Sequence, residues 1–353
     1  MSETGSQDSV SADSASVPSA QKPRLTGFPL LIVALAVVLL VQAAFVLSYV
    51  GALHAPKPHG VPFGVVGTSS VPVAVGKQFS LKLTQYSGES AARTAIDHRK
   101  IMAAFVAGPA GAKLIVAPAA GPAVASALGS AFTTAAGAFG QKVAIVQVHP
   151  LPSGDSGGIA SFLVVMALIV GGYLASTITM AYGGSATRHG RLAALACVAV
   201  FGALLTDTFA GPVIGAVPTS KFLVLWGIFT LVMMAVAFAT AALQTVLGAA
   251  GTLVVVVVLV IFGAPAAGGA VPSAFLPTFW RVLGPYLPAG AGTSTVRNTI
   301  YFDGNGITRS LLVLAAYLLV GAFVVIVIRQ RRPSSGDAIE AEASSAAAAA
   351  AVV

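Results

Sequence analysis

Residues 222–263 read FLVLWGIFTLVMMAVAFATAALQTVLGAAGTLVVVVVLVIFG, a run of 42 residues without one charged side chain. As a single helix the run would be roughly 63 Å long, about twice the thickness of bilayer hydrocarbon. The chain must therefore reverse within it, and the expected turn is marked by Gln244, Thr245, Gly248 and Gly251. The run predicts two consecutive membrane-spanning helices.

The composition of the whole chain agrees with a membrane protein. Hydrophobic residues make up 56% of the sequence, charged residues only 8%, and the mean hydropathy is +0.90. These values lie outside the range of soluble globular proteins. The net charge of +8 comes from scattered lysines and arginines that flank apolar runs, so no nucleic-acid partner is expected. The single cysteine, Cys197, excludes an intrachain disulfide.

Six membrane-spanning helices are expected, the first at 28–50 and the others within 159–330. The first run, 23 residues at 28–50, is too long for the apolar region of a cleaved signal peptide. The five later spans are placed at Ala160 to Tyr182, Leu192 to Gly211, Phe222 to Ala242, Leu247 to Phe262 and Leu311 to Ile328. The tails, 1–27 and 331–353, are rich in small and polar residues and are predicted to be disordered in the cytosol.

The orientation follows from the short basic flanks of these spans. Seven lysines and arginines fall on one side: Lys22, Arg24, Arg188, Arg191, Arg329, Arg331 and Arg332. Four fall on the other: Lys221, Arg281, Arg297 and Arg309. Because the more basic side faces the cytosol, both termini are expected there, in a multi-pass protein of the cell (plasma) membrane.

Residues 51–158 then form one extracytoplasmic insertion, predicted to be a small α/β domain between the first and second helices. Strands are expected at Val61 to Val66, Ala104 to Val106, Lys113 to Ala117 and Val143 to Val148, and helices at Glu89 to Met102 and Pro122 to Phe139. The insertion holds 8 basic and 3 acidic residues, a balance of +5. Such a surface is either a solvated basic face or a site for anionic polymer or lipid headgroups.

The segment 263–306 is neither apolar enough to span a bilayer nor polar enough for an ordinary loop. Prolines at 272, 277, 285 and 288 divide it, which leaves room for one helix near Thr278 to Tyr286 and another at roughly Gly292 to Phe302. Its aromatic and basic side chains suit the depth of the lipid headgroups, with the arginine charges reaching water: Phe279, Trp280, Arg281, Tyr286, Arg297 and Tyr301. A broken hairpin at the membrane surface is expected.

Two motifs bear on enzymatic activity. Residues 154–158 spell GDSGG, the nucleophile signature of chymotrypsin-like proteases, but that fold needs two β-barrels that an α/β insertion cannot supply. The motif is therefore interpreted as a flexible exit from the domain. No GxxxxGK[ST] phosphate loop occurs, so the chain is not itself an ATPase. No catalytic residue, cofactor or metal site is predicted, and four scattered histidines are interpreted as surface residues.

Asp207 is the only acidic residue within the six expected spans, where a charge needs water, a partner or a proton. Three interpretations stay open. Asp207 pairs with Lys221, or it faces a path between protomers, or it is wetted from the outer side.

Several of these features resemble one family. Pro-Lys-Pro-His at 56–59, Gly-Gly-Tyr-Leu at 171–174 and the string Leu-Pro, Phe-Trp-Arg, Leu-Gly-Pro within 276–285 resemble the type-2 ABC exporter permeases, most closely their YhgE/Pip (phage infection protein) relatives. The resemblance implies a six-span permease, usually a homodimer, whose hairpin gates a path between protomers. One feature departs from the family, because the loop near Gly183 to Arg191 is too short for the usual coupling helix.

Two functions follow as expectations. In the first, the chain is a permease subunit in the lipid bilayer that exports an amphiphile, lipid or cell-envelope component with energy from a separate ABC ATPase. Its candidate gate or path residues are Trp280, Arg281, Arg297, Tyr301 and Asp207. In the second, it is a surface receptor or envelope scaffold that binds through the extracytoplasmic domain and transports nothing.

Overall fold

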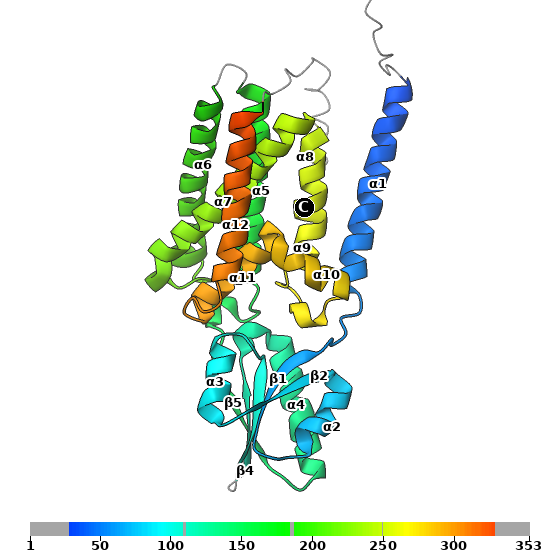
Figure 1. Cartoon of the computed structure of the whole chain (residues 1–353), viewed down its shortest axis with the longest axis vertical. Helices are drawn as coiled ribbons and strands as arrows, with labels where there is room; N and C mark the ends of the chain where they lie inside the picture. Colours follow the sequence, from blue (N-terminus) through cyan, green and yellow to red (C-terminus); the bar gives the residue numbers. More distant parts are fainter. Residues whose placement is uncertain (1–27, 109–110, 184–186, 249, 329–353) are drawn as a thin grey trace, which may run out of the picture. The chain divides into compact units, whose positions relative to one another are not determined.

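The structure is a computed structural model of the whole chain, and it describes residues 28–108, 111–183, 187–248 and 250–328 (Figure 1). The predicted tails therefore lie outside the described residues. By its contacts the chain divides into two units, Met1–Leu40 and Val41–Val353, and every contact given below lies within the second. The chain is mostly helical, and it also contains one five-stranded sheet.

Five helices are long and apolar enough to cross a membrane, which makes the chain a multi-pass membrane protein. These candidate spans are Leu35–Leu53, Ala160–Tyr182, Arg188–Val213, Thr219–Leu247 and Thr308–Val327. They correspond to the helices α1 (Phe28–Leu53), α5 (Ala160–Tyr182), α6 (Arg188–Thr208), α7 (Phe222–Leu247) and α12 (Thr308–Val327). Five of the six predicted spans thus correspond to candidate spans; the first is shifted to Leu35–Leu53, and the third, fourth and sixth are longer than expected.

The remaining predicted span is a shorter apolar helix, Ala250–Ala266. It consists of α8 (Ala250–Val255), a π-helical segment (Val256–Phe262) and α9 (Gly263–Ala266). At roughly 25 Å it is shorter than about 30 Å of hydrocarbon. The expected turn before it is confirmed, because α7 ends at Leu247 and Gly248 has a φ of +65° that favours glycine.

Helix α7 is the centre of the helical part, packed against α5, α6 and α12 (Figure 1). Glycines allow the closest approaches: a Cβ on Gly172 of α5 would lie 2.9 Å from the Met233 carbonyl oxygen, and one on Gly321 of α12 would lie 2.6 Å from the Phe238 carbonyl carbon. The outer faces of α6 and α12 stay apolar, with Phe201, Leu205, Leu319 and Phe323 exposed. Exposed apolar faces of this kind are suited to lipid.

The α/β domain follows α1, as predicted. Its strands are β1 (Val61–Val66), β2 (Leu81–Tyr86), β3 (Ala103–Gly108), β4 (Gly111–Val116) and β5 (Val143–Gln147), and its helices are α2 (Val71–Phe79), α3 (Glu89–Asp97) and α4 (Pro122–Ala138). The strand order is β2-β1-β3-β4-β5, and all neighbours are parallel except β3 and β4.

The sheet lies between two layers of helices. Phe63 and Phe105 pack with Phe132 of α4 and with α2 on one face, whereas Ala104 and Ile115 pack with α3 on the other. Successive residues of β3 thus serve opposite faces, as the period of a strand requires. The sequence interpretation missed α2 and β2, and β2 is an exposed edge strand whose side chains give little hydrophobic alternation.

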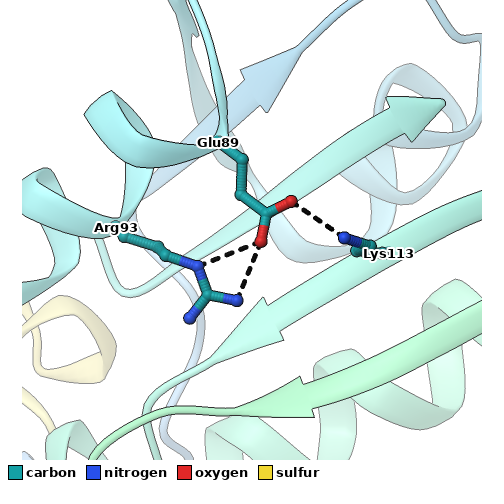
Figure 2. A network of polar contacts seen from close by, with 3 residues as sticks. All are labelled: Glu89, Arg93 and Lys113. Carbon is teal, nitrogen blue, oxygen red and sulfur yellow. Dashed lines mark hydrogen bonds and ion pairs between the residues drawn. The ribbon is translucent and has the colours of Figure 1, made fainter.

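Helix α3 begins at Glu89 as predicted but ends at Asp97 rather than at Met102. Glu89 accepts hydrogen bonds from Arg93 Nε at 3.0 Å and Nη2 at 2.8 Å, and from Lys113 Nζ of β4 at 3.0 Å (Figure 2). The helix stops because Arg99 takes a left-handed φ of +54°, which turns the chain toward β3. This turn points Arg99 toward the hairpin described next.

Candidate functional site

The hairpin predicted at 263–306 begins with α9 and continues with α10 (Thr278–Leu283) and α11 (Pro288–Tyr301). Both predicted segments are confirmed, although α11 begins four residues earlier than expected, with Pro288 in its first turn. Close packing of the backbone requires glycine at the joint. A Cβ on Gly284 would lie 2.0 Å from the Ala266 carbonyl oxygen, and one on Gly290 would lie 2.1 Å from the Gly284 carbonyl oxygen.

Helix α11 is buried along nearly its whole length, and it contacts α5, α7 and α12. Its buried residues include Thr293, Thr295, Arg297, Asn298 and Thr299, a polar set for a helix in the core of a membrane protein. Buried polar groups require hydrogen-bond partners, so the partners of α11 decide what holds it in place. They come from the backbone of α11 itself, from the segment after α9, from the α/β domain, from the segment before α5 and from the loop between α6 and α7.

Arg297 is buried, with 4% of its surface exposed. Its guanidinium donates to the carbonyl oxygens of Gly158 at 3.0 Å, Gly268 at 3.1 Å and Gly269 at 3.1 Å. Burial lowers the pKa of this guanidinium. The expectation that Arg297 carries its charge to water is therefore wrong, because backbone carbonyls in the interior replace water as acceptors.

Tyr301 at the end of α11 is bound to Asp155, which precedes α5. The Tyr301 hydroxyl donates to Asp155 Oδ2 at 2.5 Å, and Asp155 Oδ1 accepts from the backbone N–H groups of Ile159 at 3.0 Å and Ala160 at 3.1 Å. Burial, and then the hydrogen bond to Asp155, raise the pKa of Tyr301. Asp155 thus caps the first turn of α5 and holds the end of α11 against it.

These contacts change the interpretation of GDSGG at 154–158. Asp155 is 5% exposed, the Gly158 carbonyl oxygen binds Arg297, and a Cβ on Gly154 would lie 2.0 Å from the Gly215 carbonyl oxygen. The interpretation as a flexible exit is wrong, because the segment is anchored to α11 and to the loop between α6 and α7.

Arg99 connects the α/β domain to α11. Its Nη1 donates to Asn298 Oδ1 at 2.5 Å, its guanidinium lies 5.5 Å from the centre of the Phe302 ring, and Asn298 Nδ2 donates to the Asn305 carbonyl oxygen at 2.7 Å. We call the residues Arg99, Asp155, Asn298 and Tyr301 the polar seam. The seam joins the hairpin to the α/β domain and to the start of α5, and the sequence interpretation had identified only Tyr301 among candidate site residues.

Lys221 binds the same end of α11 from the loop before α7. Its Nζ donates to the carbonyl oxygens of Thr299 at 2.8 Å and Ile300 at 3.3 Å, and to Asp303 Oδ1 at 2.8 Å. A cation at a helix C-terminus satisfies carbonyls that have no partner within the helix. The predicted pair of Lys221 with Asp207 is therefore wrong, because Lys221 caps α11 and pairs with Asp303.

Asp207 lies in α6 and is 1% exposed, so its wetting from the outer side is also contradicted. Its Oδ2 has no hydrogen-bond partner within the described ranges. Neither the pair with Lys221 nor wetting from the outer side therefore describes Asp207 in this structure.

A cavity of about 280 Å³ lies between the α/β domain and the hairpin. We call it the arginine cavity because Arg99, Arg281 and Arg297 all line it, whereas none of the lining residues that the structure describes is acidic. Burial and then the charge of Arg297 lower the pKa of Arg99 to about 10.

Trp280 and Arg281 lie on α10 at the edge of this cavity. Trp280 is 7% exposed and stacks on Phe262 with ring centres 5.5 Å apart, whereas Phe279 is 58% exposed. Arg281 Nη1 donates to the carbonyl oxygen of His59, just before β1, at 2.8 Å. The structure thus brings Arg281 and Arg297 to one cavity, places Trp280 in an apolar cluster beside it, and leaves Asp207 elsewhere.

A second buried polar cluster surrounds Gln244, which the sequence had marked only as part of a turn. Gln244 Oε1 accepts from Ser176 Oγ and Arg191 Nη2, each at 3.0 Å, and its Nε2 donates to Thr177 Oγ1 at 3.1 Å and Thr252 Oγ1 at 3.0 Å. Its four hydrogen bonds connect α5, α6, α7 and α8. The cluster fixes the ends of these helices.

In the ranges that the structure describes, no group of three or more His, Cys, Asp or Glu side chains could hold a metal ion. His149 Nε2 lies 2.8 Å from Asp97 Oδ1, and the centre of the His149 ring lies 4.6 Å from the centre of the Phe302 ring.

No known protein family, curated protein or solved structure matches this chain.

Proposed function

We propose that the chain is the permease subunit of an exporter that moves an amphiphile, a lipid or a cell-envelope component across the cell membrane. In this proposal the hairpin α10–α11 is the gate at the outer end of the path, and the polar seam holds the gate closed. The observation that carries the proposal is the position of α11, which packs among α5, α7 and α12 and is joined by side chains to the α/β domain.

The side-chain hydrogen bonds that join α11 to the α/β domain support a gate because they are few. Two single hydrogen bonds lie at the boundary between the hairpin and the rest of the chain. One joins Tyr301 to Asp155 and the other joins Arg99 to Asn298, and each has one charged partner. Such bonds are each worth about 1.5–3 kcal/mol, so a ligand or a partner protein can supply the free energy that breaks them.

The proposal places both termini in the cytosol and the α/β domain outside. The supporting observation is the excess of lysine and arginine on the flanks of one side of the spans. The proposal also includes a homodimer, with the path between its two protomers, and a separate ATPase. Both are taken from the resemblance to the YhgE/Pip-type permeases. The absence of a phosphate loop from this sequence means that any ATP hydrolysis takes place on another chain.

The experiment isolates the chain from its native membrane in a mild detergent and reconstitutes it into liposomes. ATP hydrolysis is measured in the purified sample, and dithionite quenching follows the movement of fluorescently labelled anionic, zwitterionic and cationic lipids. The proposal predicts a co-purifying ATPase and ATP-dependent movement of at least one lipid class. The double variant R99Q/Y301F should alter that movement, whereas the exposed control Lys142→Gln should not.

The second candidate is a receptor or envelope scaffold that binds through the α/β domain. It is favoured by the size of that domain, whose sheet carries helices on both faces and its own core. Reconstituted protein that retains a ligand but shows neither ATP hydrolysis nor lipid movement would support the receptor and contradict the permease.

A further inference from the structure

The arginine cavity has an unbalanced positive charge. Arg99, Arg281 and Arg297 line it. The carboxylate whose charge raises the pKa of Arg297 belongs to Asp155, and it already accepts hydrogen bonds from Tyr301 and from the first turn of α5. Three guanidinium groups around one small volume repel one another unless an anion lies between them. The charge of the cavity thus points to a bound anion.

Hydrogen-bond donors in the cavity wall also lack partners. Arg297 is 4% exposed and Thr293 is 1% exposed, yet Arg297 Nε and Thr293 Oγ1 have no hydrogen-bond partner in the described part of the chain. Both residues line the cavity. Buried donors without partners are rare in folded proteins, so these two atoms indicate a ligand that accepts hydrogen bonds.

The backbone of α11 adds to the same field. Gly290, in the first turn of this 14-residue helix, lines the cavity. The N–H groups of a first helical turn have no partner within the helix, and the helix dipole is positive at this end. An anion in the cavity would meet this helix end together with the arginines.

The size and the remaining wall of the cavity select the kind of anion. Its volume of about 280 Å³ is at the lower limit for a drug-sized ligand, so it accepts a headgroup and not a whole lipid. Ala266, Ala267, Met102 and Pro272 form an apolar part of the wall. On the neighbouring α10, Phe279 is 58% and Val282 60% exposed, an apolar surface on which acyl chains can lie.

We propose that the arginine cavity binds the phosphate group of an anionic lipid headgroup, with Arg99, Arg281 and Arg297 as its cationic partners and Thr293 as a hydroxyl donor. Arginine is the side chain best suited to phosphate, because its planar guanidinium offers paired N–H donors. This binding goes beyond the proposed transport, since a site for phosphate is compatible with a permease and with a receptor, and a binding measurement without nucleotide tests it separately.

The experiment measures binding to the purified full-length chain in a neutral detergent. The probes are dioctanoyl phosphatidylglycerol, dioctanoylglycerol as the matched amphiphile without phosphate, and inorganic phosphate. The expected result is saturable binding of the phospholipid and none of dioctanoylglycerol. Arg281→Gln and Arg99→Gln should each weaken the phospholipid about tenfold or more, and Lys142→Gln, exposed and outside the cavity, should leave it unchanged.

Thr293→Val keeps the test valid if an arginine variant does not fold. This nearly isosteric change removes a buried hydroxyl without a partner, so it should leave the melting temperature unchanged or higher while it weakens the phospholipid several-fold. Tighter binding of phosphatidylglycerol than of inorganic phosphate identifies a lipid as the source of the anion. Binding of inorganic phosphate alone, equal binding of dioctanoylglycerol, or unchanged affinity in all three cavity variants would overturn the proposal.

Discussion

The hydroxyl of Tyr301 donates a 2.5 Å hydrogen bond to Asp155, a residue 146 positions earlier in the sequence. This bond joins the end of α11 to the start of α5, because the same carboxylate caps α5 through Ile159 and Ala160. One side chain thus fixes both the hairpin and a membrane-spanning helix.

Loss of the Tyr301 hydroxyl should destabilise the chain. Tyr301→Phe removes a partly buried hydrogen bond to a carboxylate and should cost about 1.5–3 kcal/mol, measured as a lower melting temperature in detergent. Asp155→Ala should cost more, because it also removes the cap of α5. The matched control is Tyr286→Phe, at a tyrosine that is 55% exposed and outside the seam. Equal effects of Tyr286→Phe and Tyr301→Phe would contradict the role of the seam.

Replacement of Lys221 should loosen the end of α11. Lys221→Met removes the hydrogen bonds to Thr299 and Ile300 and should cost about 1–2 kcal/mol. Asp303→Asn should cost less than about 0.5 kcal/mol, because the Asp303 side chain is 85% exposed to solvent.

Asp207→Asn distinguishes the observed contacts of Lys221 with α11 from the Lys221–Asp207 pair suggested by the sequence. Its effect on the melting temperature should simply add to that of Lys221→Met, because the two residues share no contact. If the double variant loses no more than Lys221→Met alone, Lys221 and Asp207 interact after all.

The close approach of α5 and α7 should not tolerate even one added methyl group. Gly172→Ala would put a Cβ 2.9 Å from the Met233 carbonyl oxygen and should cost about 1–3 kcal/mol. The matched control is Gly227→Ala in α7, the partner helix, because nothing lies within 4 Å of a Cβ at that position. The control should be neutral or slightly stabilising, since alanine favours helix more than glycine does. A similar melting temperature for both variants would contradict the packing.

Glu89 should make the stability depend on pH in the acid range. Hydrogen bonds from Arg93 and then Lys113 hold the pKa of Glu89 below its usual value (Figure 2). A lowered pKa means that the stabilisation is complete above the unfolded-state pKa, near about 4.3, and is lost as the pH falls through the lower folded-state value. The difference in melting temperature between wild type and Glu89→Gln should thus be constant above about pH 5 and vanish at lower pH.

The ion pairs of Glu89 should contribute at most about 1 kcal/mol to the free energy of unfolding, since the Glu89 side chain is 29% exposed. Arg93→Gln should reduce the effect of Glu89→Gln, because the two changes remove one interaction. A difference that persists unchanged to pH 3 would show that Glu89 acts by packing instead.

The sequence predicted the helices and strands better than the contacts between them. The charge-free run 222–263 predicted the turn at Gly248, and the short apolar stretch 61–66 predicted β1 with its observed bounds. Such patterns are local, because the period of a helix or strand is written in neighbouring residues. Arg297 and Lys221 were assigned wrong surroundings, since their partners lie far away in sequence and no local pattern encodes them.

The glycines and prolines of the hairpin show the same limit. They predicted two short helices correctly, but the requirement for Gly284 and Gly290 arises from backbone contacts that exist only in the folded chain. The arginine cavity was equally hidden, because Arg99 belongs to the α/β domain and Arg281 and Arg297 to the hairpin. The net charge of the insertion left a solvated basic face and an anionic partner both open, and it gave no place for either.

The central claim is that the polar seam holds the hairpin closed against the α/β domain, and a distance measurement tests it most directly. Spin labels are attached to cysteines at Ser87 of the domain and at Phe279 of α10, both exposed, after Cys197 is replaced by serine. Pulsed electron resonance then gives the distribution of label distances in nanodiscs. We predict one dominant distance with the seam intact and a second, longer population in the double variant R99Q/Y301F. Identical distributions with and without the seam would contradict the account.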